Sequence, residues 1–178
     1  MDKDRPMNAV LLLIPVILIR YPIMRIISKD AFQRAQHADL SDRKSRLAAN
    51  AYQATLIPMF ISLVFFTIHF DDLLNYIGLA LFLLGAVLYV KSIADYAKPA
   101  VGGINRNGLY KFSRNPMYVA FFVHFVGIGL LAESWLFLML LLLFQISVHY
   151  LILAEERWCV EKFGEEYKRY MKEVRRYI

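Results

Sequence analysis

The sequence predicts an all-α polytopic membrane protein, with five transmembrane helices and a C-terminal amphipathic helix at the membrane interface. Hydrophobic residues make up 58% of the 178 residues, against about 45–50% in a typical soluble domain. Asp, Glu, Lys and Arg are absent from four long stretches, 51–70, 73–90, 115–132 and 134–154. A soluble domain of this size cannot bury four such stretches and still cover its surface with polar residues. The pattern excludes a soluble globule, a disordered chain and a disulfide-stapled secreted module.

The first apolar segment, about 7–27, allows two interpretations. It carries Arg20 and Arg25, and Pro15 and Pro22 interrupt its helix. Long Arg side chains near a helix end can reach the membrane interface. The segment is therefore a short kinked span, or a helix in the membrane plane that reduces the number of spans to four. No small-residue cleavage site follows it, so we interpret it as a retained helix and not as a signal peptide.

The remaining segments each approach the roughly 20 residues that cross the hydrocarbon core. Only Ala132, Glu133 and Ser134 separate the last two, so we expect a tight antiparallel hairpin. After the hairpin, apolar residues recur at helical steps from Phe163 to Tyr177, which predicts an amphipathic surface helix. The expected elements are 51–70, 72–91, the hairpin 115–132/134–157 and the helix 160–177.

Lys and Arg gather on one side of the predicted membrane. They lie before residue 51, between 91 and 114, and after 154, whereas the turns at 71–72 and at 133 hold only acidic residues. By the positive-inside rule, the basic loops and the C-terminus are cytoplasmic. With five spans the N-terminus, with Lys3 and Arg5, lies outside, and with four it lies inside. The net charge of +6 fits contact with anionic lipid head groups, and we expect no nucleic-acid partner.

Chemically useful side chains are expected at the cytoplasmic end of the hairpin. A Gly-rich turn, 102–108, leads through the loop 100–114 to the segment 114–118, and Glu155-Glu156 lies near the end of the second arm. Because the start of one arm faces the end of the other, Arg114, Asn115 and Tyr118 should lie near the two carboxylates. Acidic residues are disfavoured at a helix C-terminus, so the Glu pair suggests a specific purpose.

Each of these residues also has a purely structural interpretation. Arg114 could anchor the interface, and Pro116 could start a helix. Gly127 and Gly129 could allow close helix packing. His124, Gln145 and His149 lie inside spans, where polar residues are functional candidates or form interhelical hydrogen bonds. Cys159, the only cysteine, is interpreted as a packing residue; no set of residues has metal-ligand spacing, so we expect no metal.

Four motifs together resemble the isoprenylcysteine carboxyl methyltransferase and phospholipid methyltransferase superfamily. They are Gly108-Leu109-Tyr110, Arg114-Asn115-Pro116-Met117-Tyr118, Glu155-Glu156, and Phe163-Gly164-Glu165-Glu166-Tyr167. The resemblance covers about 100–178, and residues 1–95 resemble the family only in forming hydrophobic spans, within the N-terminal region 1–99. It implies an integral membrane methyltransferase core at 100–178 that uses S-adenosylmethionine.

The resemblance also implies roles for individual residues. Glu155 and Glu156 would hold the ammonium group of the cofactor, and Gly127 and Gly129 would let the cofactor approach the backbone. The other residues that would line the cofactor pocket are Tyr110, Arg114, Asn115, Pro116, Tyr118, Tyr167 and Tyr170. The chain departs from the family pattern at Asn115, Ala120 and Arg175, where the family has His, Gly and Pro. These departures leave the methyl acceptor open.

Arg114 and Glu155 are the pair on which we expect the reaction to depend. Arg114 would bind a carboxylate of the cofactor, or a carboxylate or phosphate of the substrate. A carboxylate acceptor, such as a prenylated cysteine terminus on a small molecule or protein, needs no base. A phospholipid amine or a small thiol must lose a proton, for which Glu155, His149 or His124 are the nearest candidates.

Two other classes remain open from the sequence alone. A membrane reductase that uses NADPH carries a related Gly-x-Tyr and Arg-His-Pro-x-Tyr stretch, although the ending of this chain fits it less well. A membrane scaffold or small transporter is the non-enzymatic alternative, although no internal repeat is visible. Membrane lipids are expected partners in every case, and the oligomeric state is left open.

Overall fold

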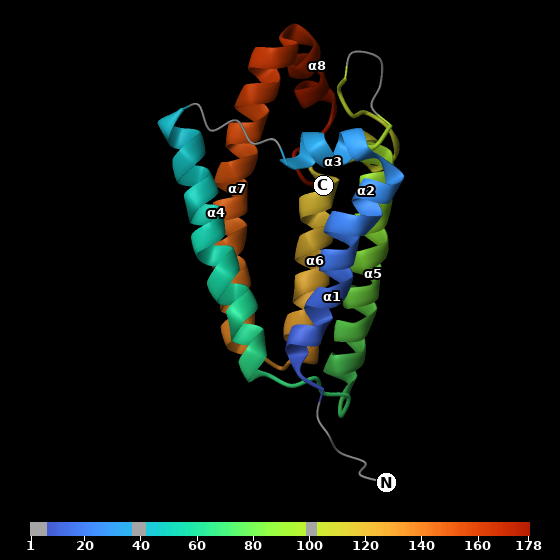
Figure 1. Ribbon diagram of the computed structural model, residues 1–178, viewed down its shortest axis with the longest axis vertical. Coiled ribbons are helices and arrows are strands. Elements are labelled where there is room, and N and C mark those ends of the chain that lie inside the picture. Colours follow the sequence, from blue (N-terminus) through green and yellow to red (C-terminus); the bar gives the residue numbers. More distant parts are fainter. Residues whose placement is uncertain (1–6, 37–41, 99–102) are drawn as a thin grey trace.

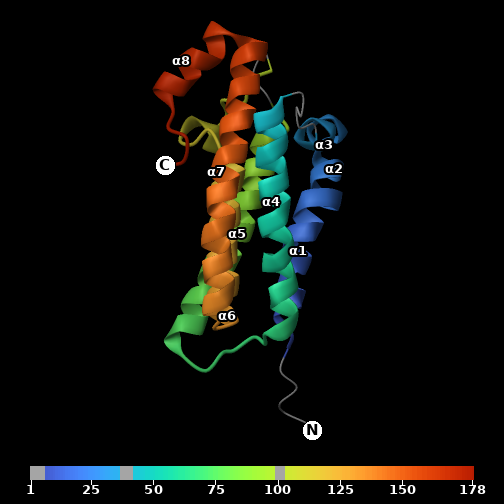
Figure 2. The same ribbon diagram turned by 90° about the vertical axis from the view of Figure 1, so that its left-hand side faces the viewer.

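The computed structural model describes residues 7–36, 42–98 and 103–178, which form a bundle of helices (Figures 1 and 2). Residues Lys3, Arg5 and Gly102, named above, lie outside these ranges. Within them the only β-type pairing is an isolated bridge between Asn8 and Thr67. The helices are α1 (Leu13–Leu18), α2 (Met24–Ile27), α3 (Lys29–Gln36), α4 (Arg43–Ser62), α5 (Leu73–Tyr96), α6 (Pro116–Leu131), α7 (Trp135–Phe163) and α8 (Glu165–Glu173).

The first apolar segment forms one continuous helical run, Ala9–Ile27, that is long and apolar enough to span a membrane. A 3₁₀ turn precedes α1, and a π-helical turn, Ile19–Ile23, joins α1 to α2. Pro22 lies inside the π turn, whose wider spacing accommodates the missing N–H of proline. Figure 1 shows this run alongside α5 and α6 and not across the bundle. The structure therefore favours a spanning helix over a helix in the membrane plane.

Helix α6, which was expected to be a full span, is shorter than the four long apolar runs of the bundle. Its 16 residues extend about 24 Å at 1.5 Å per residue, less than the roughly 30 Å of a hydrocarbon core. The helical runs Ala9–Ile27, Arg43–Phe65, Leu73–Tyr96 and Trp135–Phe163 are the four that are long enough. The shorter α6 lies among them in both ribbon views (Figures 1 and 2).

The hairpin between α6 and α7 is tight only at its turn. There, Ser134 N–H donates to Gly129 O at 3.1 Å. Beyond the turn, α6 packs mainly on α5, and α7 packs mainly on α4. Small residues explain the first pairing, because a Cβ atom added to Gly85 would lie 2.4 Å from the backbone N of His124. The two outer helices meet through Thr55 and Ser147, whose hydroxyls are 2.7 Å apart.

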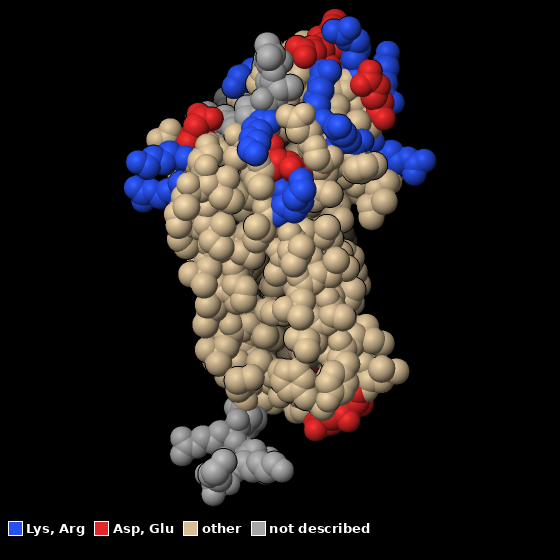
Figure 3. All heavy atoms as spheres, turned by 90° about the vertical axis from the view of Figure 1, so that its right-hand side faces the viewer, with Lys and Arg blue, Asp and Glu red and all other residues tan. Residues whose placement is uncertain are grey.

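The charges divide the molecule into a basic end, an apolar belt and an acidic end. Figure 3 shows Lys and Arg gathered at one end of the molecule, next to a broad belt without charged residues. The opposite end carries Asp71, Asp72 and Glu133 in the turns between helices. Asp72 caps α5 in a capping box with Asn75, whose amide also reaches Glu133 Oε1 at 3.0 Å. Asn75 therefore connects the turn before α5 to the turn between α6 and α7.

The C-terminal helix is shorter than the predicted 160–177. α7 continues to Phe163, Gly164 then adopts a φ of 57° that ends it, and α8 covers only Glu165–Glu173. A positive φ is easy for glycine and strained for other residues, which explains the break. The last five residues form an extended tail, 174–178, that turns back toward the start of α6 (Figure 1). Tyr177 is therefore on the tail and not on the predicted helix face.

Candidate functional site

Arg114, Glu156 and Arg176 form a charged cluster at the basic end. Nε and Nη2 of Arg114 donate to Glu156 Oε1 at 3.0 and 2.8 Å. Nη2 of Arg176 donates to Glu156 Oε2 at 2.8 Å. The side chains of Arg114 and Glu156 are each only 6% exposed. Two guanidinium groups thus occupy both oxygens of the Glu156 carboxylate.

The same arginine fixes the C-terminal tail. Nη1 of Arg114 donates to Met171 O at 2.8 Å and to Val174 O at 2.6 Å, and its backbone N–H donates to Arg175 O at 2.9 Å. The Nδ2 group of Asn115 adds a hydrogen bond to Arg176 O at 3.2 Å. Most of the guanidinium donors of Arg114 are therefore used within the chain. We call this charged cluster, together with the tail that it holds, the tail clamp.

The tail also contacts His149, which was a candidate base. The hydroxyl of Tyr177 lies 2.7 Å from Nδ1 of His149, in α7. The other candidate, His124, is 1% exposed, stacks on Phe82 with ring centroids 4.3 Å apart, and has Nδ1 2.8 Å from Phe82 O. Both histidines therefore make structural contacts.

Three predicted tyrosines connect the loop before α6 to α8. The hydroxyl of Tyr170 donates to Tyr110 O at 2.7 Å, and Tyr110, Tyr167 and Tyr170 are all buried. Arg106 lies over the ring of Tyr170 at 5.5 Å and forms an ion pair with Glu166 at 3.3 Å. Burial raises the pKa of all three phenols above the ordinary value. They stay neutral near pH 7, and the two that belong to α8, Tyr167 and Tyr170, pack this helix toward the loop that carries Tyr110.

Glu155 lies one residue before Glu156 but belongs to a different face of α7. Val148, Ile152 and Glu156 are buried, at 1%, 0% and 4% exposure, and Glu155 is turned about 100° away from Glu156 around the helix. The Tyr118 hydroxyl, from α6, donates to Glu155 Oε1 at 2.9 Å. Although Glu155 points toward the other helices, its side chain remains accessible to solvent. The inner face of the bundle thus carries an accessible carboxylate near the basic end.

Three residues near Glu155 were not among the predicted site residues. Arg20 interacts electrostatically with Glu155 and with Tyr118. Tyr52 lies near both Arg20 and Glu155, and Tyr89 lies beside Arg20. A polar residue inside an apolar segment is the signal that could have found Arg20. We call these five residues, which come from five helical runs, the inner polar cluster: Arg20, Tyr52, Tyr89, Tyr118 and Glu155.

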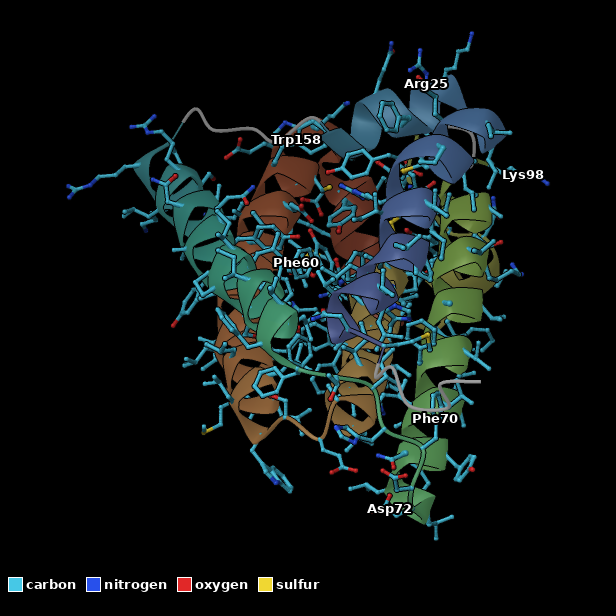
Figure 4. The ribbon with its side chains drawn as sticks, turned by 60° about the horizontal axis from the view of Figure 1, so that its bottom comes forward. Arg25, Phe60, Phe70, Asp72, Lys98 and Trp158 are labelled. Carbon is cyan, nitrogen blue, oxygen red and sulfur yellow. The ribbon has the colours of Figure 1, made fainter. Side chains whose placement is uncertain are left out.

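An aromatic layer lies below the inner polar cluster. Phe60 of α4, labelled in Figure 4, follows Tyr52 by two helical turns and contacts Phe125 with ring centroids 5.6 Å apart. Phe125 in turn contacts Phe121 and Phe137. These aromatic contacts close the bundle below the inner polar cluster, which lies between them and the basic end.

Gly127 and Gly129 are not brought to either cluster. A Cβ atom on Gly127 would lie 2.3 Å from the backbone N of Phe82, and one on Gly129 would lie 2.4 Å from Leu138 Cδ2. Both positions are occupied by close packing between helices, as in their structural interpretation. Over the described ranges, no three His, Cys, Asp or Glu side chains gather where they could hold a metal ion.

Comparison with known families finds one match. The model of the family described as phospholipid methyltransferase matches residues 74–166, slightly more than half of the chain. The match begins at α5, earlier than the resemblance over 100–178, and includes Tyr118, Glu155 and Glu156. Comparison with curated proteins and with solved structures gives no match. The chain belongs to the phospholipid methyltransferase family, a family of membrane methyltransferases.

Proposed function

We propose that the protein uses S-adenosylmethionine to methylate a lipophilic acceptor in the cytoplasmic half of the membrane. The observation that carries this proposal is the Glu155–Tyr118 pair, which lies inside the bundle and remains accessible. By the positive-inside rule the basic end is the cytoplasmic end. The pair therefore lies within reach of a soluble cofactor from the cytosol and of a lipophilic acceptor from the bilayer.

Glu155 and the neighbouring tyrosines of the inner polar cluster fit a cationic cofactor. S-adenosylmethionine carries an ammonium and a sulfonium group, and when bound it supplies an electrophilic methyl group. Glu155 accepts one hydrogen bond from Tyr118 and keeps further acceptor positions. The aromatic faces of Tyr52 and Tyr118 add favourable sites for a cation. Glu156 lacks this capacity, because two arginines occupy its oxygens.

The other predicted residues act in this proposal by positioning. Arg114, Asn115 and Glu156 hold the tail across the start of α6, and Pro116 begins that helix directly after the loop. Tyr110, Tyr167 and Tyr170 hold α8 against the same loop. Together they fix the first turn of α6, from which Tyr118 reaches Glu155. Arg114 is therefore a positioning residue, whereas Glu155 is the group that contacts the reactants.

The chemistry requires little beyond alignment and exclusion of water. The acceptor attacks the methyl carbon in line with the departing sulfur, so binding the two reactants in the correct geometry provides most of the rate. A carboxylate acceptor, such as that of a prenylated cysteine, reacts without losing a proton. An amine or thiol acceptor must lose one, and Glu155 is the carboxylate placed to accept it.

The experiment that tests this function is isothermal titration of detergent-purified protein with S-adenosylhomocysteine, beside NADPH. We expect micromolar binding of S-adenosylhomocysteine, lost in Glu155→Gln and retained in Glu161→Gln, an exposed glutamate of α7. Transfer of a labelled methyl group to a panel of prenylcysteines, phospholipids and thiols then identifies the acceptor. Binding of NADPH alone would replace the proposal with a reductase, and binding of neither would refute it.

A further inference from the structure

Arg20 is a positive charge on the inner face of the first transmembrane run. It lies seven residues before the end of the run at Ile27, which places it about 10 Å below the basic end at 1.5 Å per residue. The neighbours Leu18 and Ile17 point outward and are about half exposed, as expected for lipid contact. Arg20 itself is half-buried beside Tyr89, Tyr118 and Tyr52.

A charge at this depth needs a specific reason. Charged residues inside membrane segments are costly, face the bundle interior, and mark functional pathways. Arg20 also lies in the π-helical turn Ile19–Ile23, and π turns within helices occur frequently at functional sites. The turn presents Arg20 toward α5 and α6, whereas Arg25 of the same run is exposed and lies at the outer rim (Figure 4).

The surroundings of Arg20 lack part of the hydrogen bonding that burial demands. Tyr89 is only 1% exposed; its hydroxyl faces Arg20, but within the described residues no group meets it at full hydrogen-bond geometry. A buried hydroxyl without a partner costs free energy. A ligand oxygen next to Arg20 would provide that partner. The guanidinium fork and the phenol together match an oxyanion, since Arg binds carboxylates and phosphates through two parallel N–H groups.

The position of Arg20 favours the acceptor over the methyl donor. The segment 74–166 that matches the family model holds Tyr118 and Glu155 but not Arg20, and the donor is proposed to bind through Glu155. A guanidinium group repels the ammonium and the sulfonium of that donor. An apolar tail in the bilayer would lie against the lipid-facing residues of the same helix, with its head group at the depth of Arg20.

We propose that Arg20, assisted by the Tyr89 hydroxyl, binds an oxyanion of the lipophilic acceptor, so that this enzyme selects acceptors with a carboxylate or phosphate near the methylated atom. This inference rests on the proposed function for the identity of the reaction. Oxyanion binding by Arg20 is nevertheless a separate property, which is measured without any methyl donor.

The first test measures binding of three soluble amphiphiles, octyl phosphate, octanoate and octanol, by isothermal titration of the full chain. We expect at least one of the two anions to bind the wild-type protein ten times more tightly than octanol. Arg20→Gln removes the preference, and Tyr89→Phe weakens anion binding about three-fold. Arg25→Gln, which removes a charge from the rim of the same helix, leaves the preference unchanged. Equal binding of all three compounds to the wild-type protein, or a preserved preference in Arg20→Gln, would overturn the inference.

The second test separates recognition from folding and from the methyl donor. Arg20→Lys keeps the charge without the planar fork. We expect this variant to fold and to recover part of the anion preference. An anion preference equal to that of Arg20→Gln would contradict a charge-based site. Affinity for S-adenosylhomocysteine should change less than two-fold in Arg20→Gln, and a larger loss would assign Arg20 to the donor. If the wild-type protein prefers the anions but binds no S-adenosylhomocysteine, the oxyanion site stands and the proposed function fails.

Discussion

Exchanging each of two neighbouring glutamates for glutamine should affect two different properties. Glu156→Gln should lower the stability of the fold, and Glu155→Gln should weaken cofactor binding. Glu156→Gln removes the shared counter-charge of Arg114, which is 6% exposed, and of Arg176, which is 30% exposed. Leaving a buried charge without its partner typically costs about 3–5 kcal/mol. Glutamine keeps one carbonyl acceptor, so we expect the lower part of this range, about 3 kcal/mol. For a chain of this length, that corresponds to a fall in Tm of roughly 6–12 °C.

Glu155→Gln should leave stability nearly unchanged. Its side chain is accessible to solvent, and its one described hydrogen bond, from Tyr118, survives with an amide oxygen as acceptor. A loss below about 1 kcal/mol is expected for such an accessible group. Binding of S-adenosylhomocysteine should fall in this variant by tenfold or more, because the neutral amide no longer balances a cation.

Thermal unfolding followed by tryptophan fluorescence provides the measurement, since Trp158 lies two residues from Glu156 on α7. Limited trypsin digestion adds a local readout. In Glu156→Gln, Arg114 is no longer oriented toward the carbonyls of Met171 and Val174, so cleavage within the tail should accelerate. Wild-type stability and tail protection in Glu156→Gln, with the loss appearing in Glu155→Gln, would refute the division of roles between the two residues.

Three further outcomes follow from the packing and the buried phenols. Gly85→Ala should destabilise the protein by about 1–3 kcal/mol in thermal unfolding, because its Cβ would lie 2.4 Å from the backbone of His124; a neutral result would mean that α5 and α6 are not in backbone contact. Tyr118→Phe should weaken S-adenosylhomocysteine binding about three- to tenfold, from the loss of one hydrogen bond to a carboxylate, and unchanged affinity in titration would remove Tyr118 from the site. Burial raises the pKa of Tyr170 above its unfolded value of about 10, so the packing of α8 should persist below that pH and be lost as the pH rises toward the folded pKa. Absorbance of tyrosinate at alkaline pH, compared with Tyr170→Phe, should show one late-titrating phenol fewer in the variant; an identical titration would contradict the assigned burial.

The sequence predicted the helices well because the hydrocarbon core imposes a simple requirement. The charge-free stretches at 51–70 and 73–90 fall within the runs Arg43–Phe65 and Leu73–Tyr96 except for a few residues at the turn. The prediction of one helix over 160–177 was wrong, because a continuous apolar period from Phe163 to Tyr177 concealed the break at Gly164. The period records which residues are buried, and here α8 and the returning tail both bury apolar residues, Tyr167 and Tyr170 in one cluster and Tyr177 against the main core.

Pairing between helices was harder to predict. A short turn implied that α6 and α7 pack together, but Gly85 and Gly127 allow α5 to approach α6 more closely, and these contacts join residues about 40 positions apart in the sequence. The separate roles of Glu155 and Glu156 depend on a rotation of 100° between neighbouring helical residues. The contacts from Tyr118 and from the two arginines show which carboxylate belongs to which cluster, and Arg20 on the first run is likewise assigned by its neighbours.

The pairing of α5 with α6 and of α4 with α7 is nested in the sequence, because the second pair consists of the helices that precede and follow the first. During synthesis α5 and α6 can pair as soon as both have left the ribosome, whereas α4 must wait for α7. Tyr118 and Tyr89 are then already fixed, and Glu155 arrives with the final transmembrane helix. A chain that stops after α6 contains most of the residues of the protein but has no carboxylate beside Tyr118. Partly synthesised protein should therefore be inactive, and the ability to bind the proposed cofactor should appear late and in a single step as α7 docks.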